Sequence, residues 1–250
     1  MPRQETEIRH AAVTNHSVPR SNQESAPPNE PPAKKHPLAA FPDAFVDDPS
    51  RNTSGATARD RAIALTLLAM KHPELMANDA DFKNAVGALE ASLESDPADY
   101  AAAEALAELY LSERHTDKAI QLCKNILDED PLRETTLRII SETYSNLGQF
   151  AQATPYWERM VQLNPGMAMY WYKLGQAYAA RRRWQRSLEL AKEGKKRFPT
   201  SIGIRQLLIQ SLLSTGSSQS AEQEFKEVVA FQPAGLDRLT EWYENHPARK

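Results

Sequence analysis

The side chains that most often carry chemistry in proteins are sparse and scattered in this sequence. None of the six histidines stands near another histidine, or near the one cysteine, at the spacing that zinc ligands adopt. Those histidines are His10, His16, His36, His72, His115 and His246. A lone cysteine, Cys123, also excludes an internal disulfide. The sequence therefore predicts neither a metal site nor a cofactor.

Motifs for catalysis are absent as well. The sequence contains no Walker loop, no dinucleotide-binding glycine pattern and no G-x-S-x-G nucleophile turn. The glutamate-rich segment Glu90–Glu94 is typical of an exposed helix face, and Cys123 occupies a position where a small buried apolar residue is expected. We therefore expect a protein that is not an enzyme.

Basic side chains are concentrated between Arg181 and Arg197. Such a region can bind an acidic partner or the phosphates of a nucleic acid. Glu189 and Glu193 offset part of its charge, and the whole chain carries a formal charge of −3. We favour a solvated helix face over a nucleic-acid site. The candidate basic patch comprises Arg181, Arg182, Arg183, Lys192, Lys195 and Lys196.

The elements that must position these residues recur every 34 residues. Three series of residues repeat at this interval: prolines, small residues that lie between the prolines, and large, mostly aromatic residues. The three series are Pro97, Pro131, Pro165, Pro199 and Pro233; Ala85, Ala119, Ala153, Ser187 and Ala221; and Tyr110, Tyr144, Tyr178 and Leu212. A period of about 34 residues is typical of stacked helical hairpins, in which small residues let helices approach and prolines end them.

The segment Trp171–Tyr178 reads W-x-x-L-G-x-x-Y, and together with the period it resembles the tetratricopeptide-repeat family. This resemblance implies an all-α, right-handed superhelix, or solenoid, of stacked antiparallel helical hairpins. Four repeats are expected within 98–233, at about 98–131, 132–165, 166–199 and 200–233. Glycines 148 and 216 are expected at turns within hairpins, and Pro155 predicts a slight kink or a late helix start.

The two ends of the chain differ from the repeats. Residues 1–56 hold nine of the seventeen prolines and few periodic apolar residues, so we expect a disordered tail, whose apolar stretch Leu38–Val46 is free to dock or to stay solvated. Residues 57–97 predict a degenerate capping hairpin with Ile63, Leu67 and Met70 in its core. Residues 234–250 predict a capping helix. The first ten residues lack an apolar core and no 18-residue apolar run occurs, which predicts a cytoplasmic protein without a membrane span.

The family resemblance also assigns side chains to a concave groove lined by the first helix of each hairpin. They are Glu104, Glu108, Arg138, Glu142, Asn146, Tyr172, Gln176, Gln206 and Gln210. This groove would change from acidic to amide-rich along the stack, and amides can pair with the backbone of a bound peptide. Glu104, Glu108 and Met169 stand where some family members clamp a terminal carboxylate with basic and amide residues. Lys173 alone fits, so such a clamp is not expected.

Three functions remain open from the sequence. The first is a non-catalytic adaptor that binds a protein or peptide segment in the groove, which rests on analogy of fold. The second is a binder of RNA or another anionic partner through Arg181–Arg197, which would show a steep dependence on salt. The third is an interaction module that serves an enzyme in trans.

Overall fold

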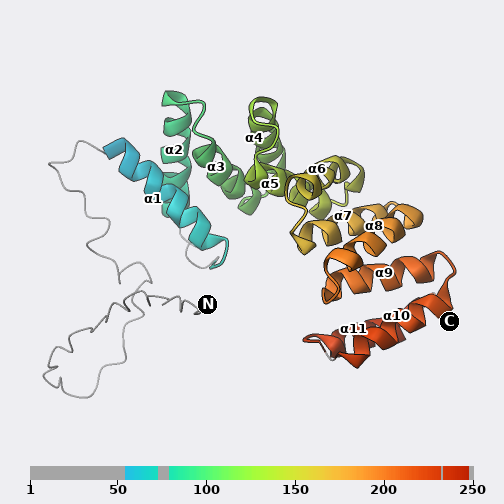
Figure 1. The fold of residues 1–250 in the computed structure, drawn as a ribbon. Coiled ribbons are helices and arrows are strands. Elements are labelled where there is room, and N and C mark those ends of the chain that lie inside the picture. Colours follow the sequence, from blue (N-terminus) through green and yellow to red (C-terminus); the bar gives the residue numbers. More distant parts are fainter. Residues whose placement is uncertain (1–53, 73–78, 232, 248–250) are drawn as a thin grey trace, which may run out of the picture. The chain divides into compact units, whose positions relative to one another are not determined.

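A computed structural model describes residues 54–72, 79–231 and 233–247, with side chains from residue 58 onward except that of residue 79. The described residues form eleven α-helices and no strand. The expected disorder of the tail, including Leu38–Val46, lies outside the described residues, except that the first helix already begins at Ser54. Figure 1 shows helical hairpins that follow one another in chain order.

Four hairpins repeat at the expected interval. Their first helices are α3 (Tyr100–Ser112), α5 (Glu134–Asn146), α7 (Ala168–Ala180) and α9 (Ile202–Ser214). Their second helices are α4 (Thr116–Glu129), α6 (Phe150–Leu163), α8 (Trp184–Arg197) and α10 (Ser218–Ala230). Each first helix starts 34 residues after the previous one, as each second helix does. The all-α solenoid of stacked hairpins expected from the sequence is confirmed.

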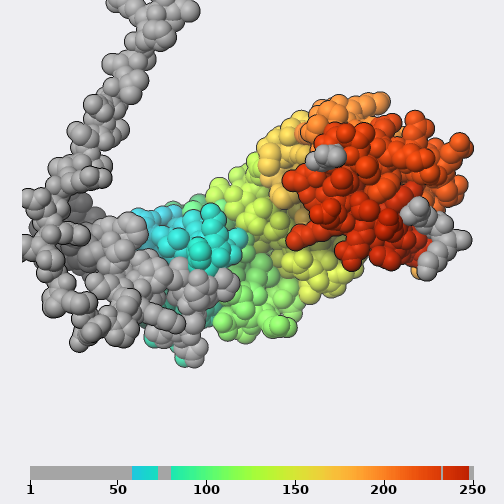
Figure 2. Space-filling model, turned by 90° about the horizontal axis from the view of Figure 1, so that it is seen from below, coloured from blue at the N-terminus to red at the C-terminus, as the bar shows by residue number. Residues whose placement is uncertain are grey.

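Additional helices stand before and after these hairpins. Helices α1 (Ser54–Ala69) and α2 (Asp79–Ser95) pack against each other and against α3, and α11 (Leu236–Glu244) follows α10. Figure 2 shows α1, in cyan, against the green residues of the next hairpin. In α11 the side chains of Leu239 and Tyr243 are buried while Asp237 and Glu241 are exposed, as the amphipathic pattern predicts.

The small-residue series allows the close packing between helices. Ala119, Ala153, Ser187 and Ala221 are all fully buried. At a second small position, a Cβ added to Gly175 would lie 2.0 Å from the Cδ2 atom of Leu207, so a larger residue there would force the Leu207 side chain to move. Large residues such as Trp157 and Leu137 fill the remaining space and have no exposed surface.

The turn within each of the four hairpins uses one repeated backbone motif. The second residue after the last helical one has positive φ in each turn, at Arg114, Gly148, Arg182 and Gly216. The next residue donates its N–H to a carbonyl five residues back, as from Gln149 to Tyr144 at 2.8 Å and from Ser217 to Leu212 at 2.8 Å. This is the Schellman ending of a helix, in which glycine is favoured because it has no Cβ. Two turns use arginine and therefore carry strain.

We expect Arg114→Gly and Arg182→Gly each to raise the free energy of unfolding by about 1 kcal/mol, because left-handed backbone is unfavourable for a residue with a Cβ. Gly148→Ala should lower it by about the same amount at the equivalent position. Urea unfolding followed by circular dichroism would measure all three. Equal stability of Arg182→Gly and the parent protein would contradict the strain at this turn.

Two expectations about local structure are wrong. Of the two effects expected from Pro155, the late helix start is wrong: α6 begins at Phe150 in register with its equivalents, and the proline lies within the helix. In α1 the buried side chains are Ala62 and Thr66, and the expected core residues Leu67 and Met70 are 57% and 46% exposed.

Candidate peptide-binding groove

The first helices of the hairpins pack against one another in two groups, α1 with α3 and α5, and α7 with α9. Helix α1 contacts α3, α3 contacts α5, and α7 contacts α9. Residues 34 positions apart within each group therefore become neighbours, which brings together the predicted groove residues of α3 and α5, and those of α7 and α9. We call the exposed surface of α1, α3, α5, α7 and α9 the A-helix face.

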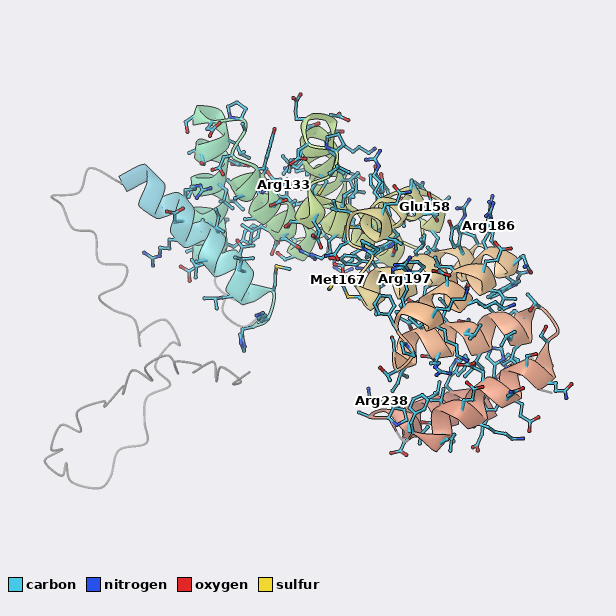
Figure 3. All side chains as sticks on the ribbon, viewed as in Figure 1. Arg133, Glu158, Met167, Arg186, Arg197 and Arg238 are labelled. Carbon is cyan, nitrogen blue, oxygen red and sulfur yellow. The ribbon has the colours of Figure 1, made fainter. Side chains whose placement is uncertain are left out.

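Glu104, the first predicted groove residue, is engaged in holding two hairpins together. Its carboxylate accepts hydrogen bonds from Arg133 at 2.7 and 3.0 Å and from the Thr136 hydroxyl at 2.6 Å. The residue is buried, with 7% of its surface exposed. Arg133, which immediately precedes α5, is labelled in Figure 3. The pairing raises the pKa of Arg133, although burial works in the other direction. Glu104 is therefore a contact between hairpins and offers no free carboxylate to a ligand.

Glu108, Arg138 and Glu142 form a half-buried charged cluster on α3 and α5. Arg138 donates from Nη2 to Glu108 at 3.0 Å and from Nη1 to Glu142 at 2.9 Å. Burial opposes the charge on the guanidinium, but the hydrogen bond to Glu108 and the charges of both carboxylates raise the pKa of Arg138 above its ordinary value. The cluster holds one cation for two anions.

A cavity of about 580 Å³ opens beside this cluster. It brings together three of the predicted groove residues, Glu108, Glu142 and Asn146, with the end of α1. The remaining lining is mostly apolar: Thr66, Ala69, Met70, Phe82, Leu109, Leu111, Ser112, Glu113, Ile139 and Thr143. Its volume is in the range of protein ligand sites. The cavity, bounded by these residues, is called the α1–α3–α5 cavity below.

The amide-rich part of the predicted groove lies on α7 and α9. Gln176 donates from Nε2 to the Tyr172 hydroxyl at 2.7 Å, and the Tyr172 ring lies against Gly203, where an added Cβ would be 3.3 Å from the ring. Burial raises the pKa of Tyr172, and the bond from Gln176 opposes this. Gln206 and Gln210 are half-buried on α9. Tyr172 is thus held rigidly on the A-helix face.

The predicted basic patch is divided by the structure. Lys195 points to the next hairpin, where its Nζ lies 2.5 Å from Glu224 and 2.9 Å from Glu227. Lys196 and Arg197 share Glu193 at 3.5 and 3.3 Å, and Figure 3 shows Arg186 and Arg197 toward opposite ends of α8. Arg181 donates to the Thr154 hydroxyl at 3.1 Å. Only part of the patch, Arg182, Arg183 and Lys192, is exposed without a side-chain ion pair among the described residues.

Sequence reasoning missed the α1 wall of the cavity and the carboxylate of Glu113. The α1 wall was missed because Leu67 and Met70 were interpreted as core residues, whereas Ile63 does pack against the core. Glu113 follows the last helical residue of α3, one position beyond the set that the family resemblance assigned. Glu108 and Glu142 are 34 residues apart, and this spacing did predict that their side chains lie close together.

Comparison with known proteins identifies the repeats. Two tetratricopeptide-repeat sequence models match the chain, one over residues 77–135 and one over residues 141–202. The chain belongs to the tetratricopeptide-repeat family. The first match includes α2 together with the first regular hairpin, so the capping hairpin shares the tetratricopeptide-repeat pattern in part. No curated protein sequence matches the chain.

Solved structures of MamA share the tetratricopeptide-repeat fold of the chain. MamA AMB-1 aligns with a TM-score of 0.60 at 18% identity, covering 75% of this chain and 98% of its own. MamA MSR-1 gives 0.58 at 18% identity, covering 77% and 99%. MamA from Desulfovibrio magneticus RS-1 gives 0.57 at 15% identity, covering 72% and 96%. At these identities the likeness is one of fold.

Tetratricopeptide repeats are typically non-catalytic scaffolds for contacts between proteins. Within the described part of the chain, no helix is long and apolar enough to cross a membrane. The same residues contain no group of three or more histidine, cysteine, aspartate or glutamate side chains placed to hold a metal ion. Cys123 is buried, and burial raises the pKa of its thiol to about 12, which keeps the thiolate scarce at neutral pH.

Proposed function

We propose that this chain is a non-catalytic adaptor that binds a segment of a partner protein along the A-helix face. The observation that carries the proposal is the α1–α3–α5 cavity, which gathers Glu108, Glu142 and Asn146 from consecutive first helices beside apolar side chains of α1. A mostly apolar hollow with a few polar groups of fixed geometry is the usual form of a binding site.

The amide-rich end of the A-helix face supports the same function. Gln206 and Gln210 stand half-buried one helical turn apart on α9, and their side chains form no hydrogen bond within the described residues. Free amides of this kind can pair with the backbone of an extended segment. Tyr172, fixed by Gln176, offers a rigid ring at low entropic cost. The two regions would hold different parts of one segment, or one of them would bind alone.

Two arginine substitutions test the proposal on the whole chain. Asn146→Arg places a bulky cation in the cavity, whereas Gln152→Arg places the same side chain on the exposed surface of α6. Proteins captured from an extract of the source cells should be lost with Asn146→Arg and kept with Gln152→Arg. Both variants should unfold like the parent in urea. Equal recovery of the same proteins by both variants would exclude the cavity as the binding site.

A second candidate function rests on Arg182, Arg183 and Lys192, which are exposed and free of ion pairs among the described residues. A surface with these charges can bind an anionic partner, including RNA. Its affinity would fall steeply with salt and would be abolished by changing Arg181, Arg182 and Arg183 to glutamate. Salt-insensitive binding that survives this change favours the A-helix face.

A further inference from the structure

The end of α1 presents an apolar strip beside the α1–α3–α5 cavity. The strip consists of Leu67 and Met70, which are 57% and 46% exposed, whereas Leu68 lies about half a turn of the helix away from the lining residue Thr66. Met70 belongs both to the strip and to the cavity lining. Contiguous exposed apolar residues next to a hollow mark interaction sites more often than isolated ones do. This surface accounts for the stripe that the sequence placed in the core.

The cavity also carries an excess of negative charge. Its lining contributes the carboxylates of Glu108, Glu113 and Glu142, against the one guanidinium of Arg138 that pairs with two of them. Glu113 is exposed and forms no ion pair among the described residues. Lys71 follows Met70 but does not belong to the lining. A bound cation would therefore find at least one unneutralised carboxylate.

Three helix ends add to this field. Helix α1 ends at Ala69, α3 at Ser112 and α5 at Asn146, and all three residues line the cavity. The carboxyl end of a helix is equivalent to roughly half a negative charge. None of the three helices has a basic side chain in its last turn to offset that charge. Parallel packing of the first helices is the reason that these ends meet.

We propose that the partner segment docked here is apolar and carries a lysine or arginine side chain. Its apolar residues would pack on Leu67 and Met70, and its cation would lie near Glu113 and the three helix ends. This inference rests on the proposed function and adds the chemical class of the partner. An acidic segment would meet like charges in the cavity and is excluded by the same field.

Selection from a library of random dodecapeptides displayed on phage, with the full chain immobilised, tests this class directly. Peptides enriched by the parent protein should combine leucine, methionine or phenylalanine with an excess of lysine or arginine. Selection on Glu113→Gln should lose most of the basic excess, whereas the matched change Asp128→Asn, on the exposed surface of α4, should leave it unchanged.

The most strongly enriched peptide would then be synthesised, and its affinity for the parent protein and for each variant would be measured. Glu113→Gln and Leu67→Ser should each weaken its binding to the full chain about tenfold, because each removes one of the two proposed contacts. Asp128→Asn and Leu132→Ser, the latter at a leucine of similar exposure in the loop before α5, should change it less than twofold. Glu113→Gln removes a negative charge from a helix end and is therefore expected to fold at least as well as the parent.

The outcomes separate this inference from the function on which it rests. Enrichment of neutral or acidic peptides that Asn146→Arg abolishes would keep the adaptor function and overturn the basic–apolar class. A basic excess that persists unchanged with Glu113→Gln would overturn the proposed position of the cation at Glu113. Absence of any peptide that distinguishes the parent from Asn146→Arg would overturn both.

Discussion

Trp157→Ala should lower the free energy of unfolding by about 3–5 kcal/mol, the range for removing a large aromatic side chain from a core. Trp157 has no exposed surface and packs beside Tyr170, with ring centroids 6.3 Å apart. Its indole N–H donates to the Ser145 hydroxyl at 3.0 Å. The substitution therefore removes packing and leaves a polar group with one fewer partner.

Urea unfolding followed by far-ultraviolet circular dichroism measures this loss without relying on tryptophan fluorescence. Trp184→Ala is the matched control because Trp184, the first residue of α8, is only half-buried. Its loss should be clearly smaller. Repeat proteins can unfold one repeat at a time. Amide hydrogen exchange should therefore be faster in α5, α6 and α7 of Trp157→Ala than in the same helices of the parent protein. A melting temperature of Trp157→Ala within a degree of the parent would contradict the central position of this side chain.

The second large effect is expected at the ion pair between Arg205 and Glu224. The two side chains are only 8% and 6% exposed, and Lys195 and Glu227 complete the group. Hydrogen bonds from Lys195 and Arg205 lower the pKa of Glu227, and Arg205 also donates from Nε to the Pro199 carbonyl at 2.8 Å. The group joins α8, α9 and α10.

Glu224→Leu should lower the free energy of unfolding by about 3 kcal/mol, because it leaves the buried Arg205 with a single, more exposed carboxylate partner. The double variant Arg205→Met with Glu224→Leu should recover most of this loss, since a buried ion pair replaced by apolar residues is often close to neutral. Denaturant unfolding of both single variants and the double variant measures the coupling. Additive losses would show that the two side chains do not act as a pair.

The periodic features of the fold could be predicted from the sequence because they depend on local rules repeated four times. The small residues at Ala119 and its equivalents, and the glycine turns at Gly148 and Gly216, follow from close packing and from left-handed backbone. The same period correctly made Glu108 and Glu142 neighbours. Each of these inferences used only spacing and residue size.

The features that could not be predicted depend on contacts between distant residues. Glu104 stands at a groove position of the repeat, but Arg133 and Thr136, on the next hairpin, draw it into a buried contact. Lys195 does not contribute to an exposed basic patch because it pairs with Glu224, which lies 29 residues later in the chain. In α1 two helical faces are apolar, and periodicity alone does not say which one packs on α2 and α3.

Photo-crosslinking tests most directly that the A-helix face binds the partner. A photoreactive phenylalanine in place of Ser112, at the cavity, or in place of Gln152, on the exposed surface of α6, would be introduced into the full chain in the source cells. We predict a discrete crosslinked protein from position 112 and none from position 152. The same adducts from both positions, or adducts from position 152 alone, would contradict the account.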